Sequence, residues 1–261
     1  RALPRSYLNG LNFLLKEQPD KAIDAFIEAV RIDPQTIELH FALGSLFRRR
    51  GETDRAIRIH QLLVDREDLS QEQRLQALAE LGEDFLKAGL LDRAEAVFLK
   101  LRDSGAQDVA LPFLLEIYQQ EKDWAKAIEV ARALPNHESV MWRREVANFH
   151  CELAAGALAN SRFDEVRAHL DEAFAINRGC VRASMLLGDL LQAEGRDEHA
   201  LEAWKRFENQ DPVYLSLVAE RVMEAYERLG RVDQGHQLLR SWMEGHASLG
   251  LLDELFQREL E

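Results

Sequence analysis

His150 and Cys151 come nearest to a catalytic pair in type and spacing, since an imidazole beside a thiol can generate a nucleophilic thiolate. Neighbouring residues on a helix point about 100° apart, so these two side chains cannot form the hydrogen bond of a catalytic dyad. We interpret both as buried structural residues, with a reactive thiol as the alternative. The other cysteine, Cys180, lies 29 residues after Cys151.

No other motif of catalysis or cofactor binding is present in the sequence. It has no phosphate-binding glycine loop, G-x-S-x-G, H-E-x-x-H or C-x-x-C. Two cysteines are too few for a disulfide framework or a four-thiolate zinc site, and the histidines show no i, i+4 pairing on one helix. We therefore predict a chain from a reducing compartment that is not an enzyme, with no catalytic, cofactor-binding or metal-binding residues.

Five arginines lie close together in the sequence, namely Arg48, Arg49, Arg50, Arg55 and Arg58. One interpretation is structural: cations at a helix C-terminus complement the helix dipole by about 0.3–1 kcal/mol each, and Gly51 is suited to end the helix. The other is a docking patch for an acidic segment of a partner, because arginine offers bidentate donors. Arg55 and Arg58 lie beyond the predicted helix end, where the dipole does not reach. The candidate docking residues are Arg48, Arg49, Arg55 and Arg58.

The overall charge excludes several other partners. The chain has 33 Lys and Arg against 46 Asp and Glu, a formal net charge of −13, which repels nucleic-acid phosphates and anionic lipid head groups. No stretch approaches the roughly 18 unbroken apolar residues of a membrane-spanning helix. Nucleic acid and bare membrane are therefore not expected as partners.

The elements that position these residues are predicted to be helices throughout. Apolar residues recur at i, i+3, i+4 and i+7, prolines and glycines are few (6 and 14), and no run alternates as a strand does. A repeated pattern, with a period of about 34 residues, carries a small residue, an aromatic residue three positions on, and later an alanine followed by an aromatic residue. Its copies start near residues 3, 37, 75, 108, 147, 181 and 216, with a partial helix from about residue 250.

This pattern resembles the tetratricopeptide repeat. The resemblance implies an all-α fold, in which residues 1–261 form a single domain of about seven helix-turn-helix repeats. Such repeats stack into an elongated superhelix, an α-solenoid, whose concave surface is made mainly by the first helix of each repeat.

Individual positions in the repeats carry their own predictions. Small residues such as Gly44 let the two helices of a repeat approach closely, so Gly44→Leu should cost about 1–3 kcal/mol. His60 is predicted to be a packed core histidine, because other copies of the repeat have large aromatic residues at that position. Ser70 and Gln73 have the spacing of a capping box at the start of a helix.

The first helix of the first repeat is unusually apolar on its predicted inner face. Tyr7, Leu11 and Leu14 lie on that face, so a segment outside this chain covers it or it forms a groove for an apolar helix of a partner. Chaperone-cofactor repeats that bind C-terminal carboxylates place Lys and Asn on the inner face of the first two helices. Here those positions hold Tyr7, Leu11, Ala42 and Ser45, so no such clamp is expected.

Several stretches resemble the lipopolysaccharide assembly protein B family of Gram-negative bacteria. They are Asn12–Leu15, Asp20–Asp24, Leu46–Glu52, Asp54–Gln61, Ala88–Glu95, Ile117–Gln120, Trp124, Lys126–Ile128 and Phe149–Leu153. Together they span most of residues 6–212, and the arginine-rich run is the most specific of them.

The resemblance implies a protein on the cytoplasmic side of the bacterial inner membrane. Its family has an N-terminal membrane anchor and a C-terminal rubredoxin-like zinc module, and we expect both to lie outside this chain, which leaves the anchor as the only membrane contact. The resemblance also implies an adaptor that presents the deacetylase committing to lipid A synthesis to a membrane-bound AAA+ protease, under restraint by a membrane-embedded sensor protein. The alternative is a general tetratricopeptide scaffold that gathers envelope-biogenesis enzymes.

Overall fold

The computed structural model describes residues 5–16, 18–33, 35–246 and 248–259, and within them every regular element is a helix. The chain divides into two compact units, residues 1–135 and 136–261. The division falls after Pro135, in a connection without α-helix between Ala133 and Val140.

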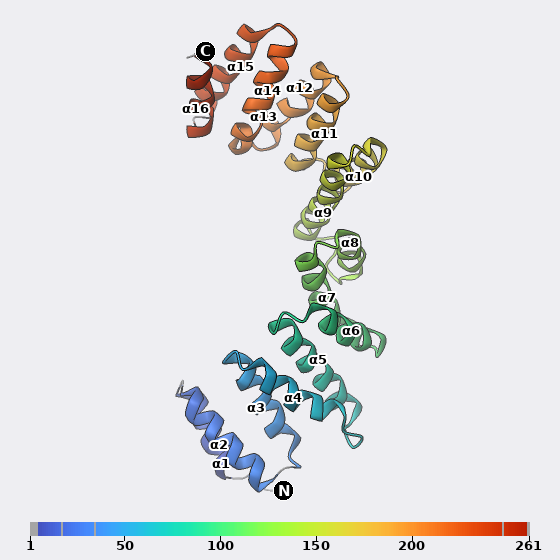
Figure 1. Ribbon diagram of the computed structural model, residues 1–261, viewed down its shortest axis with the longest axis vertical. Coiled ribbons are helices and arrows are strands. Elements are labelled where there is room, and N and C mark those ends of the chain that lie inside the picture. Colours follow the sequence, from blue (N-terminus) through green and yellow to red (C-terminus); the bar gives the residue numbers. More distant parts are fainter. Residues whose placement is uncertain (1–4, 17, 34, 247, 260–261) are drawn as a thin grey trace. The chain divides into compact units, whose positions relative to one another are not determined.

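The first unit consists of antiparallel helices that follow one another in chain order (Figure 1). They are α1 (Arg5–Leu15), α2 (Pro19–Ile32), α3 (Ile37–Arg49), α4 (Thr53–Val64), α5 (Gln71–Lys87), α6 (Leu91–Asp103), α7 (Gln107–Glu121) and α8 (Trp124–Ala133). Each helix packs against the next one, and α5 also contacts both α3 and α7. This contact pattern is that of stacked helical pairs, in which neighbours supply the core.

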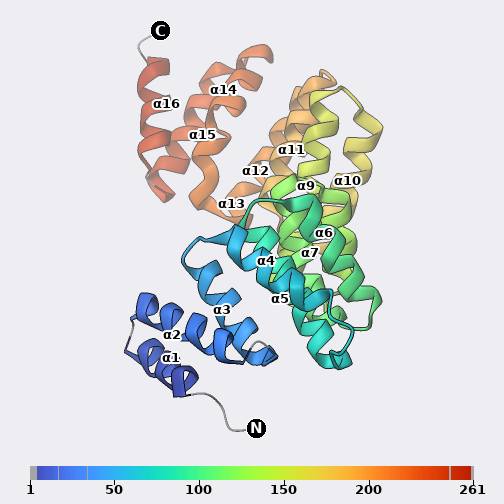
Figure 2. The same cartoon turned by 60° about the horizontal axis from the view of Figure 1, so that its bottom comes forward.

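The second unit is itself built of helices that pack against their neighbours in the chain. It comprises α9 (Val140–Ala159), α10 (Phe163–Ile176), α11 (Val181–Ala193), α12 (Asp197–Lys205), α13 (Phe207–Gln210), the 3₁₀ helix η1 (Pro212–Leu217), α14 (Ala219–Arg228), α15 (Val232–Gly245) and α16 (Leu249–Glu259). Helices α9 and α10 run side by side, and α11 packs against both (Figure 2). The all-α solenoid of tetratricopeptide type that the sequence predicts is therefore present.

Helix starts can be compared with the predicted repeat starts. Helices α3 and α11 begin at the expected positions, Ile37 and Val181. Helix α9 begins at Val140 rather than near residue 147, because the Ser139 hydroxyl accepts a hydrogen bond from the backbone N–H of Trp142 and starts the helix there. Ser70 and Gln73 form the predicted capping box at the start of α5.

Close helix packing explains the glycines of the repeat. A Cβ atom added to Gly82 would lie 2.7 Å from the Phe98 ring, and one added to Gly44 would overlap the ring of His60. His60 is fully buried, so its predicted place in the core is confirmed. The glycine of a first helix thus provides the space for the large ring on the second helix of the same repeat.

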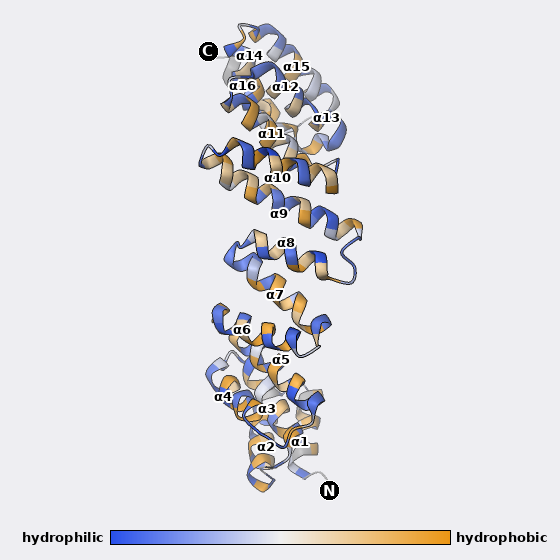
Figure 3. Ribbon diagram, turned by 90° about the vertical axis from the view of Figure 1, so that its right-hand side faces the viewer, coloured by the Kyte–Doolittle hydropathy of each residue, from blue (hydrophilic) through white to orange (hydrophobic). Residues whose placement is uncertain are grey.

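The cores lie between neighbouring helices rather than at one centre. One cluster of buried side chains joins α2, α3 and α4 around Phe26 and Phe47, and another joins α11, α12, α14 and α15 around Trp204. Apolar and polar residues occur on each helix, as amphipathic packing requires (Figure 3). Among the described helices, none combines the length and apolarity that a membrane crossing demands.

Candidate protein-interaction surfaces

The arginine run straddles a helix end, as its sequence predicts. Arg48 and Arg49 close α3, Arg50 is its C-cap residue, and Gly51 has a φ of +77°, the left-handed conformation that ends the helix. Arg50 forms ion pairs with Asp20 and with Glu52, at its own turn. The five arginines have different environments and therefore different roles.

Arg48 is held inside the fold. Its guanidinium donates to Asp84 at 2.8 Å and to Glu80 at 2.7 Å, and it lies 3.1 Å from Glu83, all on α5. The Asp84 carboxylate is fully buried and also lies 2.5 Å from Nδ1 of His60. Arg48 thus ties the second helical pair to the third, and this internal network uses the donors that docking would need.

The positive charge of Arg48 and the negative charges around it affect each other's pKa values. Burial lowers the pKa of Arg48, but its hydrogen bonds to Asp84 and Glu80 outweigh that effect, so the pKa lies above its ordinary value and the guanidinium stays charged. Burial raises the pKa of Glu83 despite the neighbouring Arg48. A permanent cation therefore stabilises a cluster of carboxylates that would otherwise repel one another.

Arg55 also has an internal role. It lies in the first turn of α4, 3.9 Å above the Phe47 ring, and pairs with Glu52 at 2.7 Å. The same stacking of a cation on the aromatic residue of the preceding helix recurs along the first unit, in the pairs Phe13 with Lys21, Phe85 with Arg93 and Tyr118 with Lys126. This stacking is a feature of the repeat itself.

Arg49 and Arg58 remain as the exposed cations of the run. Arg49 lies at the end of α3 and Arg58 in the middle of α4, and in the described part of the chain neither has an ion pair or hydrogen bond. Of the apolar candidates on α1, Leu11 is exposed, with Leu8 and Leu15 beside it on the same helix. The side chains of Tyr7 and Leu14 lie outside the part that the structure describes.

The second unit contains a cavity of about 620 Å³ that sequence reasoning missed. Its cationic and amide walls come from Arg144 and Asn148 on α9 and from Arg182 on α11. Its apolar walls include Tyr214 and Leu217 on η1, which are about half exposed. The remaining lining residues are Asn177, Gly179, Cys180, Val181, Met185, Phe207, Gln210 and Asp211.

The charges around this cavity are only partly neutralised. Arg182 forms an ion pair with Glu152 at 2.7 Å, whereas Arg144 is exposed and has no ion pair among the described residues. The Asp211 carboxylate accepts a hydrogen bond from the backbone N–H of Val213. The sequence gives no common signal for these lining residues, because they lie on separate helices and connections of the second unit.

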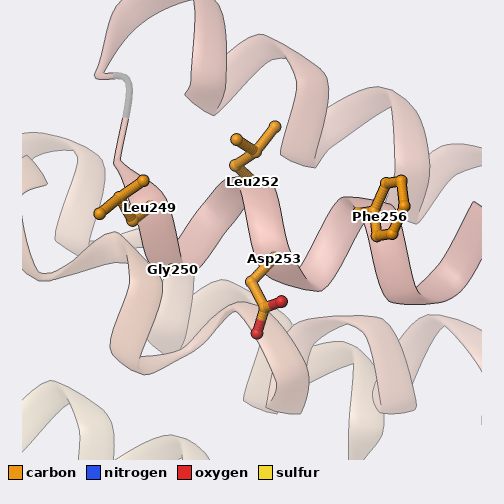
Figure 4. A pocket seen from close by; sticks show the side chains of 5 residues that line it. All are labelled: Leu249, Gly250, Leu252, Asp253 and Phe256. Atoms are coloured by element: carbon orange, nitrogen blue, oxygen red, sulfur yellow. The ribbon is translucent and has the colours of Figure 1, made fainter.

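A smaller hollow lies on the last helix. It is lined by Leu249, Gly250, Leu252, Asp253 and Phe256 of α16 (Figure 4). The three large apolar side chains are exposed, and Leu252 and Phe256 share one side of the helix. Nothing in the structure indicates what would cover them.

The two residues of the His-Cys pair point to different partners. Nδ1 of His150 lies 3.4 Å from Nδ1 of His169 on α10, while the Cys151 sulfur lies 3.8 Å from the Cys180 sulfur. Both residues are buried, as predicted. Within the described residues no cluster of three or more histidine, cysteine or carboxylate side chains is arranged to hold a metal ion.

Comparison with known proteins finds the repeat within the first unit. The tetratricopeptide repeat family matches residues 39–72, a segment that includes most of α3 and all of α4. A tetratricopeptide repeat protein of known structure from Parabacteroides merdae ATCC 43184 aligns with a TM-score of 0.49 and 14% identity, over 97% of this chain and 98% of that one. The helical pairs and the repeat match define this chain as a tetratricopeptide-repeat protein.

Two curated relatives from different bacteria share one name. Lipopolysaccharide assembly protein B of Escherichia coli (strain K12) is 40% identical over 243 residues, covering 93% of this chain and 62% of that protein. The protein of the same name from Haemophilus influenzae (strain ATCC 51907 / DSM 11121 / KW20 / Rd) is 35% identical over 240 residues, covering 88% and 60%. The chain is therefore a homologue of lipopolysaccharide assembly protein B and spans about three fifths of those relatives' length.

Proposed function

We propose that this chain is the repeat region of a non-enzymatic adaptor that limits lipopolysaccharide output. In this proposal it presents the deacetylase that commits to lipid A synthesis to a membrane-bound AAA+ protease, on the cytoplasmic side of the inner membrane, and a membrane-embedded sensor protein restrains it. The observation that carries the proposal is the 40% identity to lipopolysaccharide assembly protein B over 93% of this chain. A general scaffold for envelope-biogenesis enzymes is the alternative.

In this proposal, the cavity of the second unit contributes part of the free energy of binding to a partner protein. Arg144 and Arg182 would attract an acidic segment of a partner protein, and Tyr214 and Leu217 would contact an apolar side chain of that segment. The chain as a whole has a net charge of −13, so a local cationic surface on it favours acidic partners. Exposed Arg49, Arg58 and Leu11 of the first unit are proposed as further contact residues.

Depletion of the full-length protein in cells, with the deacetylase followed by immunoblot, tests the adaptor role. The proposal expects the deacetylase level to rise after depletion and to fall again when the wild-type protein is restored. An unchanged level contradicts the adaptor and favours the scaffold.

The same complementation experiment tests the proposed contact surfaces separately from the adaptor role. Arg144→Gln with Arg182→Gln should leave the deacetylase level raised, whereas Arg143→Gln, at an exposed neighbour outside the cavity, should restore control. Arg49→Gln with Arg58→Gln tests the first unit in the same way. If wild type and all variants restore control equally, the adaptor stands and the proposed surfaces are wrong.

A further inference from the structure

The two cysteines are brought together by the packing of α9 against α11. Cys151 lies in the middle of α9 and Cys180 is the N-cap residue of α11, so α10 and its connections separate them along the chain. Their sulfur atoms are 3.8 Å apart, and both residues are free thiols. A disulfide bond requires about 2.0 Å between the sulfur atoms, so the two sulfurs need to approach each other by about 1.8 Å.

The two thiols differ in access and in acidity. Both cysteines are buried, Cys151 completely and Cys180 with 4% of its surface exposed, but of the two only Cys180 lines the cavity of the second unit. The hydrogen bond with Cys151 lowers the pKa of Cys180, and the first backbone amides of α11 and the Arg182 guanidinium add to that effect against the cost of burial. The same hydrogen bond and burial raise the pKa of Cys151. The direction of these shifts, together with its position on the cavity wall, assigns Cys180 as the nucleophile of the pair.

We propose that Cys151 and Cys180 form a thiol oxidation site, in which a peroxide that enters the cavity converts the pair into an intramolecular disulfide. This inference is independent of the proposed adaptor role. It needs no metal and no catalytic base, because the nucleophile, the resolving thiol and the route of access are all present in the second unit.

The reaction proceeds in two balanced steps. First, the Cys180 thiolate attacks one oxygen of hydrogen peroxide, the O–O bond breaks, and Cys180 sulfenic acid forms with release of hydroxide. Second, the Cys151 sulfur attacks the Cys180 sulfur, the S–O bond breaks, the S–S bond forms, and the Cys151 proton leaves with the hydroxyl as water. The two cysteines lose two electrons in total, and the peroxide accepts them.

The position of the bond gives it a structural consequence. Helix α9 carries Arg144 and Asn148, and α11 carries Arg182 and Met185, so the disulfide would join two walls of the same cavity. Oxidation would therefore fix the spacing of α9 and the start of α11. A reversible increase in the melting temperature of the oxidised chain is expected, because the crosslink restricts the unfolded state.

The test exposes the native chain to hydrogen peroxide, blocks the remaining thiols by alkylation, and maps peptides without reduction. We expect loss of alkylation at both cysteines together, a linked peptide within one chain, and recovery of both thiols after treatment with dithiothreitol. Thiols that remain alkylatable after exposure that oxidises free glutathione completely would overturn the proposal, and so would a disulfide formed only between two chains.

Serine variants test the order of the steps. In Cys151→Ser, dimedone should trap a sulfenic acid at Cys180, because the resolving thiol is absent. In Cys180→Ser, Cys151 should stay unmodified, and the peroxide-dependent rise in melting temperature should disappear from both variants. Far-UV circular dichroism checks that each variant is folded. Faster oxidation of Cys151 than of Cys180 in the single variants would contradict the assigned roles.

Discussion

Replacing Arg48 by Gln distinguishes an internal network from a helix-end effect. The change removes the hydrogen bonds to Asp84 and Glu80 and leaves the fully buried Asp84 carboxylate with His60 as its remaining partner. Breaking a buried ion pair by removing one partner costs about 3–5 kcal/mol. Arg49, one residue away on the same helix, is exposed and unpaired among the described residues, so Arg49→Gln should cost less than about 0.5 kcal/mol.

Urea denaturation followed by far-UV circular dichroism measures both effects. The denaturation midpoint of the Arg48→Gln variant should fall strongly, while that of Arg49→Gln stays close to wild type. A double variant with Asp84→Asn should lose less than the sum of the single changes, because both members of one pair are then neutral. Equal losses of about 0.3–1 kcal/mol at Arg48 and Arg49 would show that both merely complement the helix dipole, and would refute the network.

Three further outcomes follow from the packing and the charges. Gly44→Ala should destabilise the chain by about 1–3 kcal/mol because its Cβ meets the His60 ring, whereas Gly156→Ala, which meets nothing within 4 Å, should stabilise it by about 0.5–1 kcal/mol, both measured by thermal unfolding. Destabilisation at both glycines would contradict the packing argument. Burial raises the pKa of Glu95, but hydrogen bonds from Tyr118 and Lys126 leave it below its ordinary value, so its stabilising effect is present at neutral pH and is lost as the pH falls through that lowered pKa. Tyr118→Phe should therefore cost about 1 kcal/mol at pH 7 and less under strongly acidic conditions, and a pH-independent cost would count against this assignment. Elemental analysis of the purified chain should find no stoichiometric zinc, and one zinc per chain would contradict the prediction.

Much of the fold could be predicted because its determinants are local. The spacing of apolar residues predicts helices, Ser70 with Gln73 predicts the start of α5, and Gly51 predicts the end of α3. The glycine of a first helix and the large ring on the helix that follows it identify the contact within a repeat, including the buried position of His60. These features depend on side chains within one helix or one helical pair, whose geometry is nearly the same in every copy.

The candidate sites were less predictable, because they depend on contacts between pairs. The sequence groups the arginines of the run together, but only the structure shows that Arg48 is bonded to α5 while Arg49 is exposed. Arg55 has a signal within the sequence, since a cation follows the aromatic residue of four repeats at the same distance. No comparable rule predicts the 3.8 Å approach of Cys151 and Cys180.

The sequence by itself determined the helices, the repeat type and the relationship to lipopolysaccharide assembly protein B. Helix formation and close packing within a repeat depend on residues in the same helix or the same helical pair. The repeated sequence pattern therefore predicts both. The tertiary structure alone decided which charges are buried, where the cavity lies and which thiols meet. Those outcomes depend on which side chains of one helical pair meet those of the next pair, and such contacts join residues that lie far apart in the sequence, as Arg48 and Asp84 do.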